Sequence, residues 1–204
     1  GTVPQGSGGT SLSNAINLAT GSYNTTTFSS ASAGTDDGTT GTTVTKRFYN
    51  SSSRSWDTVD AWRTTIDVYQ GRWSSGHNRG FWFFGTALSS ALAGKTISSM
   101  KVYITRKSGA GYYQPIPVRI YTHDMAVYTD NPDSTAQDPV SNGHIYTGAY
   151  VTTNLTFGES KWVDITALAT RFSSHGAKGL CVYTPSTSET DYGKFNTDII
   201  VEVT

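Results

Sequence analysis

From about Val44 to its end, the chain alternates apolar and polar residues with a period of two. The stretch "TTIDVYQG" puts Ile66 and Val68 on one face, and "KTISSMKVYITRK" includes Val102 and Ile104 among strand-forming residues. This alternation is typical of strands that bury one face. The same pattern recurs in "VTKRFY", "FWFFG", "IPVRIYTH", "HIYTGAYVT", "KWVDIT", "GLCVYT" and "DIIVEV". Turns rich in Gly, Ser, Asn and Pro separate these segments, so the pattern predicts about eight to ten strands.

One segment, "DITALATRFSSHG", breaks the alternation and predicts a short helix. Asp164 or Thr166 can cap its start, and Gly176 can end it. This helix would cover one open end of the β-structure. Strands at this spacing with a single helix indicate an all-β fold, namely a two-sheet antiparallel β-sandwich of jelly-roll type.

Residues 1–43 have a different composition from the rest of the chain. The stretch "TTTFSSASAGTDDGTTGTT" contains Thr, Ser, Gly and Asp with a single Phe. Threonine favours extended backbone, but such a segment lacks apolar residues of its own to bury. To be ordered, it must pack against the following domain or against a second chain. We therefore divide the chain into an extended low-complexity segment, residues 1–43, and a β-sandwich domain, residues 44–204.

The densest aromatic cluster of the chain is Trp82, Phe83 and Phe84. Alternation places Trp82 and Phe84 on one side of a strand and Phe83 on the other, so at least one face belongs to the core. Gly71 and Gly80 bracket a predicted turn just before this strand. The candidate ligand-binding residues in that turn are Arg72, Trp73, His77, Asn78 and Arg79. An arginine there can equally stabilise the turn by donating to backbone carbonyls.

Further candidates are tyrosines that stand beside polar residues in predicted loops. They are Tyr112, Tyr113, Tyr128 and Tyr192. Proteins bind sugars by stacking the apolar face of the sugar on an aromatic ring, while neighbouring polar groups contact the hydroxyls. Each of these rings can instead be buried, and that alternative stays open.

The composition limits the classes of partner and cofactor that we expect the chain to bind. Of the 204 residues 15% are charged and the formal net charge is zero, which gives no electrostatic reason to expect nucleic acid or an anionic membrane as partner. No stretch reaches the ~20 apolar residues of a membrane-spanning helix. The single cysteine, Cys181, lies in an apolar run and is expected to be a buried structural thiol. One cysteine and four scattered histidines do not form a zinc site, and we expect no cofactor.

The sequence contains no clear pattern of a catalytic site. Glycosidase chemistry needs two carboxylates about 5–10 Å apart, and no pair is marked by its spacing. The candidates are Asp57, Asp60, Asp67, Asp124, Glu159, Asp164, Glu189 and Asp191. The chain has no G-x-S-x-G motif. Oxygen-bearing residues gather between Thr129 and Asp138, but their spacing is not that of an EF-hand, which favours a solvated loop over a calcium site.

A series of motifs resembles a known protein family. It consists of Tyr69–Gln70–Gly71, Trp73, Arg79–Gly80 and "WFFG", then "ALAGKTISSMKVYITRKSGAG", "VRIYTH", a strand containing Trp162 before a small helix, and "GLCVYT". The series, from about Thr64 to Thr204, resembles a β-sandwich module of minor tail and tail-tip proteins of bacteriophages that infect Gram-positive hosts. It is also similar to jelly-roll carbohydrate-binding modules.

The resemblance implies an extracellular virion component at the phage tail. Its partners would be host cell-wall polysaccharide and other tail proteins, and a homotrimer is implied by analogy with phage fibres. Three functions follow, in order of preference. The first is a non-catalytic module that binds host-surface carbohydrate, the second is a purely structural assembly module, and the third is a polysaccharide depolymerase.

Overall fold

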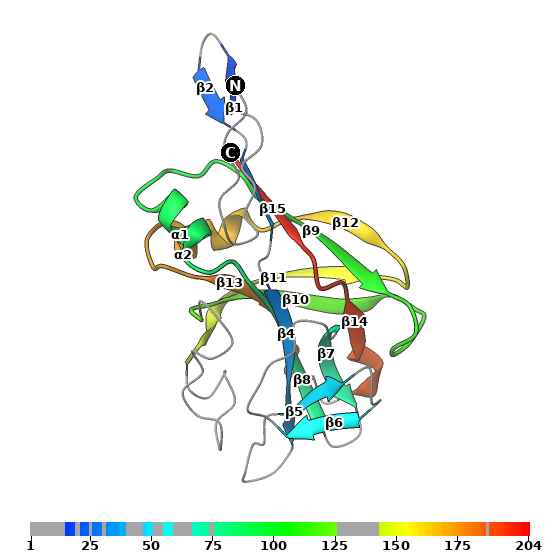
Figure 1. Ribbon diagram of the computed structural model, residues 1–204. Coiled ribbons are helices and arrows are strands. Elements are labelled where there is room, and N and C mark those ends of the chain that lie inside the picture. Colours follow the sequence, from blue (N-terminus) through cyan, green and yellow to red (C-terminus); the bar gives the residue numbers. More distant parts are fainter. Residues whose placement is uncertain are drawn as a thin grey trace.

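A computed structural model describes the chain over residues 15–18, 21–24, 26–29, 32–39, 47–50, 55–58, 67–73, 76–125, 143–186 and 188–204. The described fold is all-β with few and short helices (Figure 1). Every strand pairing in it is antiparallel. The all-β class expected from the alternating pattern is therefore confirmed.

Eleven strands form one sheet. They are β3 (Thr26–Ser29), β4 (Ser32–Thr39), β7 (Val68–Trp73), β8 (Gly76–Phe83), β9 (Met100–Lys107), β10 (Ile116–His123), β11 (Ile145–Leu155), β12 (Ser160–Asp164), β13 (Gly179–Val182), β14 (Gly193–Phe195) and β15 (Ile200–Val203). The order along the sheet is β11-β10-β13-β8-β7-β14-β9-β15-β3, with β12 also paired to β9 and β4 to β8. Two separate hairpins are β1 (Ala15–Leu18) with β2 (Gly21–Asn24), and β5 (Arg47–Asn50) with β6 (Ser55–Thr58).

The short strand β14 makes the sheet continuous. Its residues pair with β7 through Gly193–Phe195 and with β9 through Lys194 and Phe195. It thereby joins the half that contains β8, β10 and β13 to the half that contains β9, β12 and β15 (Figure 1). Sequence periodicity predicts individual strands but not such a link, because the link depends on which distant strands pair.

Strands of the Thr/Ser/Gly-rich segment belong to this sheet. β3 pairs with β15 at the chain's end, and β4 pairs with β8. Phe28, the one aromatic residue of "TTTFSSASAGTDDG", is only 1% exposed and lies in the core. Residues 26–29 and 32–39 thus pair with strands of the same chain, and one apolar side chain anchors β3.

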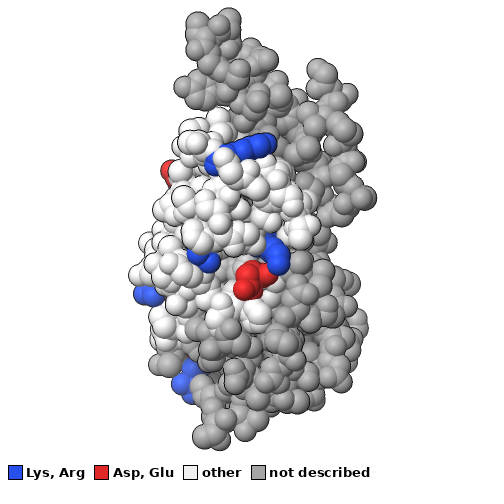
Figure 2. All heavy atoms as spheres, turned by 90° about the vertical axis from the view of Figure 1, so that its left-hand side faces the viewer, with Lys and Arg blue, Asp and Glu red and all other residues white. Residues whose placement is uncertain are grey.

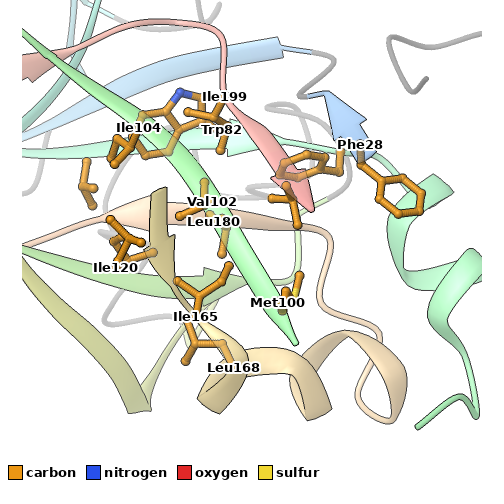
Figure 3. Close-up of a cluster of buried hydrophobic side chains, with 14 of the residues drawn as sticks. Phe28, Trp82, Met100, Val102, Ile104, Ile120, Ile165, Leu168, Leu180 and Ile199 are labelled. Carbon is orange, nitrogen blue, oxygen red and sulfur yellow. The ribbon is translucent and has the colours of Figure 1, made fainter. Parts of the chain in front are cut away.

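The main core takes side chains from both halves of the sheet (Figure 3). Trp82, Ile120 and Leu180 come from one half, and Val102 and Ile104 come from the other. Strand β9 shows the period of two directly, since its buried and more accessible positions alternate from Met100 to Lys107. Full burial of an aliphatic or aromatic side chain contributes about 1.5–3 kcal/mol, so this cluster is the main source of stability.

A second, smaller cluster lies on the opposite face of β8. It contains Phe81, Phe83, Tyr121, Met125, Ile145 and Cys181. Trp82 and Phe84 belong to the main core, so the predicted division of the aromatic run between two faces is confirmed. Cys181 is fully buried, as expected, and this burial raises the pKa of its thiol.

The helix predicted after Asp164 is present as a 3₁₀ turn, η2 (Thr166–Leu168), followed by α2 (Ala169–Ser173). The Asp164 carboxylate accepts hydrogen bonds from the Thr166 hydroxyl at 2.6 Å and its backbone N–H at 2.9 Å, which lower the pKa of Asp164. The expectation of a single helix is wrong, because α1 (Ala87–Leu92) lies beside α2 (Figure 1). With six residues, α1 is too short for a clear helical period.

Candidate functional site

An exposed tryptophan at the end of β7 is the first element of the site. Trp73 is 51% exposed, and one face of its ring stacks on Tyr192 with the centroids 5.3 Å apart. Tyr192 in turn stacks on Tyr69 at 5.6 Å. Tyr69 and Tyr192 are both buried, so they hold Trp73 from below and leave its other face to solvent.

The sequence "YQGRW" explains this stack. Side chains two residues apart in a strand share a face, so Tyr69 and Trp73 point the same way with Gly71 between them. A Cβ atom on Gly71 would lie 2.6 Å from the Asp191 carbonyl oxygen and 3.0 Å from the Tyr192 Cα. Glycine at this position therefore lets the 191–192 backbone come close enough for Tyr192 to sit between the two rings.

The loop between β9 and β10 supplies the second wall. Its Tyr112 and Tyr113 are 53% and 69% exposed. Gly111 has a φ of +73°, and a Cβ there would lie 1.7 Å from the Tyr192 carbonyl oxygen. The loop thus rests directly on the backbone of the residue that supports Trp73, and only glycine fits both the conformation and the space.

A buried arginine holds this loop from beneath. Arg106 follows Met100, Val102 and Ile104 on the inward face of β9 and is 0% exposed. Its guanidinium donates to the carbonyl oxygens of Gln114 and Leu155, both at 2.8 Å, and to that of Tyr112. Desolvation lowers the pKa of Arg106. Its hydrogen bonds join the loop at 112–114 to the end of β11.

The same guanidinium lies 4.7 Å from the ring centroid of Phe157, which follows β11. The turn that carries Phe157 is closed by Glu159, whose carboxylate accepts a hydrogen bond from the Thr156 N–H at 2.8 Å. That bond, with Lys161 nearby, lowers the pKa of Glu159. Arg106 therefore fixes two backbone segments and one aromatic ring at the same site.

These segments enclose two adjoining hollows. The first hollow has a volume of about 820 Å³ and is lined by Trp73, Gly111, Tyr112, Tyr113, Phe157, Ser188, Glu189 and Thr190. The second hollow has a volume of about 350 Å³ and is lined by Tyr112, Tyr113, Gln114, Pro115, Thr190 and Asp191. The polar residues come from the short 3₁₀ turn η3 (Glu189–Asp191), from its N-cap, Ser188, and from Gln114 of the loop between β9 and β10. Exposed rings beside hydroxyl, amide and carboxylate groups form a surface suited to a flat, hydroxylated ligand.

The structure brings only some of the predicted site residues together. Trp73, Tyr112 and Tyr113 meet in the first hollow, and Tyr192 supports them from below. Side chains alternate along β7, so the half-buried Arg72 points away from Trp73. Tyr128 and the calcium candidate, residues 129–138, lie outside the described residues.

The turn predicted between Gly71 and Gly80 is shorter than expected. β7 continues to Trp73 and β8 begins at Gly76, so His77, Asn78 and Arg79 lie in a strand. Asn78 is fully buried and donates to the Gly71 carbonyl at 3.0 Å, and Arg79 is 6% exposed with its guanidinium 5.4 Å from the Tyr183 ring centroid. Asn78 and Arg79 are therefore structural. The backbone of His77 lies in β8, and its side chain is outside the described part of the chain.

Sequence reasoning missed Arg106 and Phe157, and it considered Glu189 and Asp191 only as possible catalytic carboxylates, not as part of a binding surface. Arg106 carried a readable signal, because "MKVYITR" puts a charge in the row of inward positions after Ile104. A charged residue at a core position needs partners, and polar carbonyls at the edge of the core provide them. Phe157 and Ser188–Asp191 gave no comparable pattern.

Comparison with known proteins does not assign the chain to a family. No model of a protein family matches the chain, and no curated protein matches it either. Within the described residues, no helix is long and apolar enough to cross a membrane. The same residues contain no group of three or more His, Cys, Asp or Glu side chains that could hold a metal ion.

Proposed function

We propose that this chain is a non-catalytic carbohydrate-binding module, with its ligand stacked on Trp73, Tyr112 and Tyr113. The observation that carries the proposal is the exposure of these three rings around one hollow, over a backbone fixed by Arg106 and Gly111. A rigid aromatic surface binds with little loss of conformational entropy. The polar groups of Ser188, Glu189 and Thr190 lie beside the rings, where sugar hydroxyls need partners.

The surface charge agrees with a neutral, hydroxylated ligand. Figure 2 shows the side of the molecule that faces left in Figure 1, where the described residues are mainly uncharged, with isolated basic and acidic side chains. Among the residues that line the two hollows, the charged ones are Glu189 and Asp191. The site therefore does not provide the basic patch that binds polyanions. Recognition would therefore depend on stacking and hydrogen bonds in the groove that the two hollows form, rather than on long-range electrostatic attraction.

The biological setting proposed is a phage tail whose module adsorbs to host cell-wall polysaccharide. This part rests on the sequence motifs between Thr64 and Thr204. The fold proposed with it is a jelly-roll sandwich in which the two halves of the continuous sheet cover the shared core. Among the carboxylates considered for a depolymerase, Glu159 and Asp164 are unsuited to the role of general acid, because their lowered pKa values hold them as anions. A general acid needs the opposite shift.

Binding of the purified chain to Gram-positive cells and to a glycan array tests the proposal. The variant Trp73→Ala/Tyr113→Ala should lose about tenfold or more in affinity, equivalent to ~1.4 kcal/mol. Its matched control is Tyr103→Ala/Trp162→Ala, which removes a second pair of exposed rings, 37% and 45% exposed, on β9 and β12. Equal binding by the wild type and the groove variant would remove this site from the account.

The second candidate function is assembly with another copy of the chain. The observation that favours it is the Tyr103–Trp162 pair, whose ring centroids are 5.3 Å apart on a solvent-facing part of the sheet. An assembly module would form a stable oligomer that the Tyr103→Ala/Trp162→Ala variant weakens. Light scattering combined with a cell pull-down separates this outcome from glycan binding.

A further inference from the structure

The two hollows share one wall. Tyr112, Tyr113 and Thr190 line both of them. A ligand that fills the first hollow therefore already touches residues that border the second. Both volumes, about 820 and 350 Å³, fall within the ~300–1,000 Å³ typical of small-molecule sites. Each hollow is large enough to receive part of a chain-like ligand.

The hollows differ in chemistry. The first hollow adds Trp73 and Phe157 to the shared tyrosines, so four aromatic rings line it beside the polar Ser188 and Glu189. The second hollow adds Gln114 and Asp191, whose amide and carboxylate oxygens can accept hydrogen bonds from hydroxyl groups. A hollow with four rings next to a hollow with further polar groups offers stacking to one sugar unit and hydrogen bonds to the next.

The shared wall is ordered by contacts within the protein. Arg106 donates to the carbonyl oxygens of Tyr112 and Gln114, on either side of Tyr113. The Gln114 amide also donates to the Tyr113 hydroxyl oxygen at 3.3 Å. A ligand that crosses the wall would therefore meet a preformed surface rather than having to order a loop.

We propose that the two hollows are neighbouring subsites for one extended oligosaccharide, which crosses the Tyr112–Tyr113 wall. This inference rests on the proposed function and adds the class of ligand: a chain of several sugar units rather than a single sugar. The first hollow anchors the chain by stacking, and the second hollow extends the contact by hydrogen bonding. Arg106 is the positioning residue that holds the wall between them.

Comparing the affinities of oligosaccharides of increasing length tests the inference. The probes are oligomers of N-acetylglucosamine, glucose and rhamnose with one to six units, and the measurement is the Kd by calorimetry. For the sugar that binds, affinity should rise about tenfold or more between the disaccharide and the tetrasaccharide and then level off. Trp73→Ala should weaken binding at every length. Gln114→Ala, at an exposed residue of the second hollow, should weaken the longer oligomers by about fivefold and the short ones less, through the lost hydrogen bond to Tyr113 alone.

The outcomes separate the inference from the proposed function. If binding depends on Trp73 but its affinity does not rise beyond one or two sugar units, the inference is overturned and the proposed function still stands. The same holds if Gln114→Ala acts equally at all lengths or at none. If no oligomer of the three sugars shows Trp73-dependent binding, both are overturned.

Discussion

Trp73 and Trp82 stand nine residues apart on paired strands and have opposite environments. Trp82 is 1% exposed, and its indole N–H donates to the Asn196 carbonyl at 3.0 Å inside the main core. Trp73 is 51% exposed, and one face of its ring is supported by Tyr192. The same side chain thus stabilises the core in one strand, and in the other it presents an exposed ring that we propose binds the ligand. Burial on both faces, rather than residue type, separates the two roles.

The largest expected effect comes from truncating the core tryptophan. Trp82→Ala removes a large buried side chain and leaves a cavity, which should lower the free energy of unfolding by about 3–5 kcal/mol. It also leaves the Asn196 carbonyl without its indole donor. Urea unfolding followed by circular dichroism measures the loss. A loss below about 1 kcal/mol would contradict the assignment of Trp82 to the core.

A glycine in the groove wall should produce the next largest effect. Gly111→Ala forces a side chain into the left-handed region and against the Tyr192 carbonyl, so we expect a loss of about 3 kcal/mol together with weaker glycan binding. Gly109→Ala is the matched control. Gly109 also has a positive φ, +90°, but the nearest atom to its added Cβ, Lys194 Nζ, is 3.7 Å away. This control should cost about 1 kcal/mol, and equal losses in the two variants would contradict the proposed close contact.

A buried histidine beside the second, smaller cluster should make the stability of the fold depend on pH. His123 lies edge-on to Phe81 and Phe83 and bonds to the Trp82 carbonyl oxygen at 2.8 Å. Desolvation lowers its pKa from 6.5 to about 4. The unfolded chain therefore binds the proton more readily, and stability is lost as the pH falls from the unfolded towards the folded pKa. Between pH 7.5 and 5 the loss should be about 2 kcal/mol.

Urea unfolding at the two pH values, in the wild type and in His123→Asn, measures this contribution. The variant should be less stable at pH 7.5 but should lack this part of the pH dependence. His175→Asn, at an exposed residue after α2, is the control and should keep it. An identical pH dependence in the wild type and His123→Asn would show that His123 is not the group responsible.

The smallest effect on stability is expected at Trp73. Since its ring is half exposed and packs mainly on Tyr192, Trp73→Ala should change the free energy of unfolding by about 1 kcal/mol or less. Glycan affinity should fall in the same variant. A loss as large as that of Trp82→Ala would make Trp73 a core residue and remove the difference between the two tryptophans.

The sequence pattern predicted most strands of the sheet, the helix after Asp164 and the division of "FWFF" between two faces, but not β3, β4 or β14. It also singled out Trp73, Tyr112 and Tyr113, because loop aromatics beside polar residues are unusual in a core. It did not predict that Asn78 and Arg79 are buried, since the short connection between β7 and β8 keeps them within a strand. It also did not predict the continuous sheet, the second helix or the role of Arg106. These depend on contacts between residues far apart in the chain.

The most direct test of the central claim follows the indole N–H signals of the five tryptophans by NMR during titration with the oligosaccharide that binds. The Trp73 signal should shift and saturate with the same Kd as the calorimetric titration. The signals of Trp82, in the core, and Trp162, on the far side of β9, should stay in place. Saturable binding that leaves the Trp73 signal unchanged, or that shifts Trp162 instead, would contradict the account.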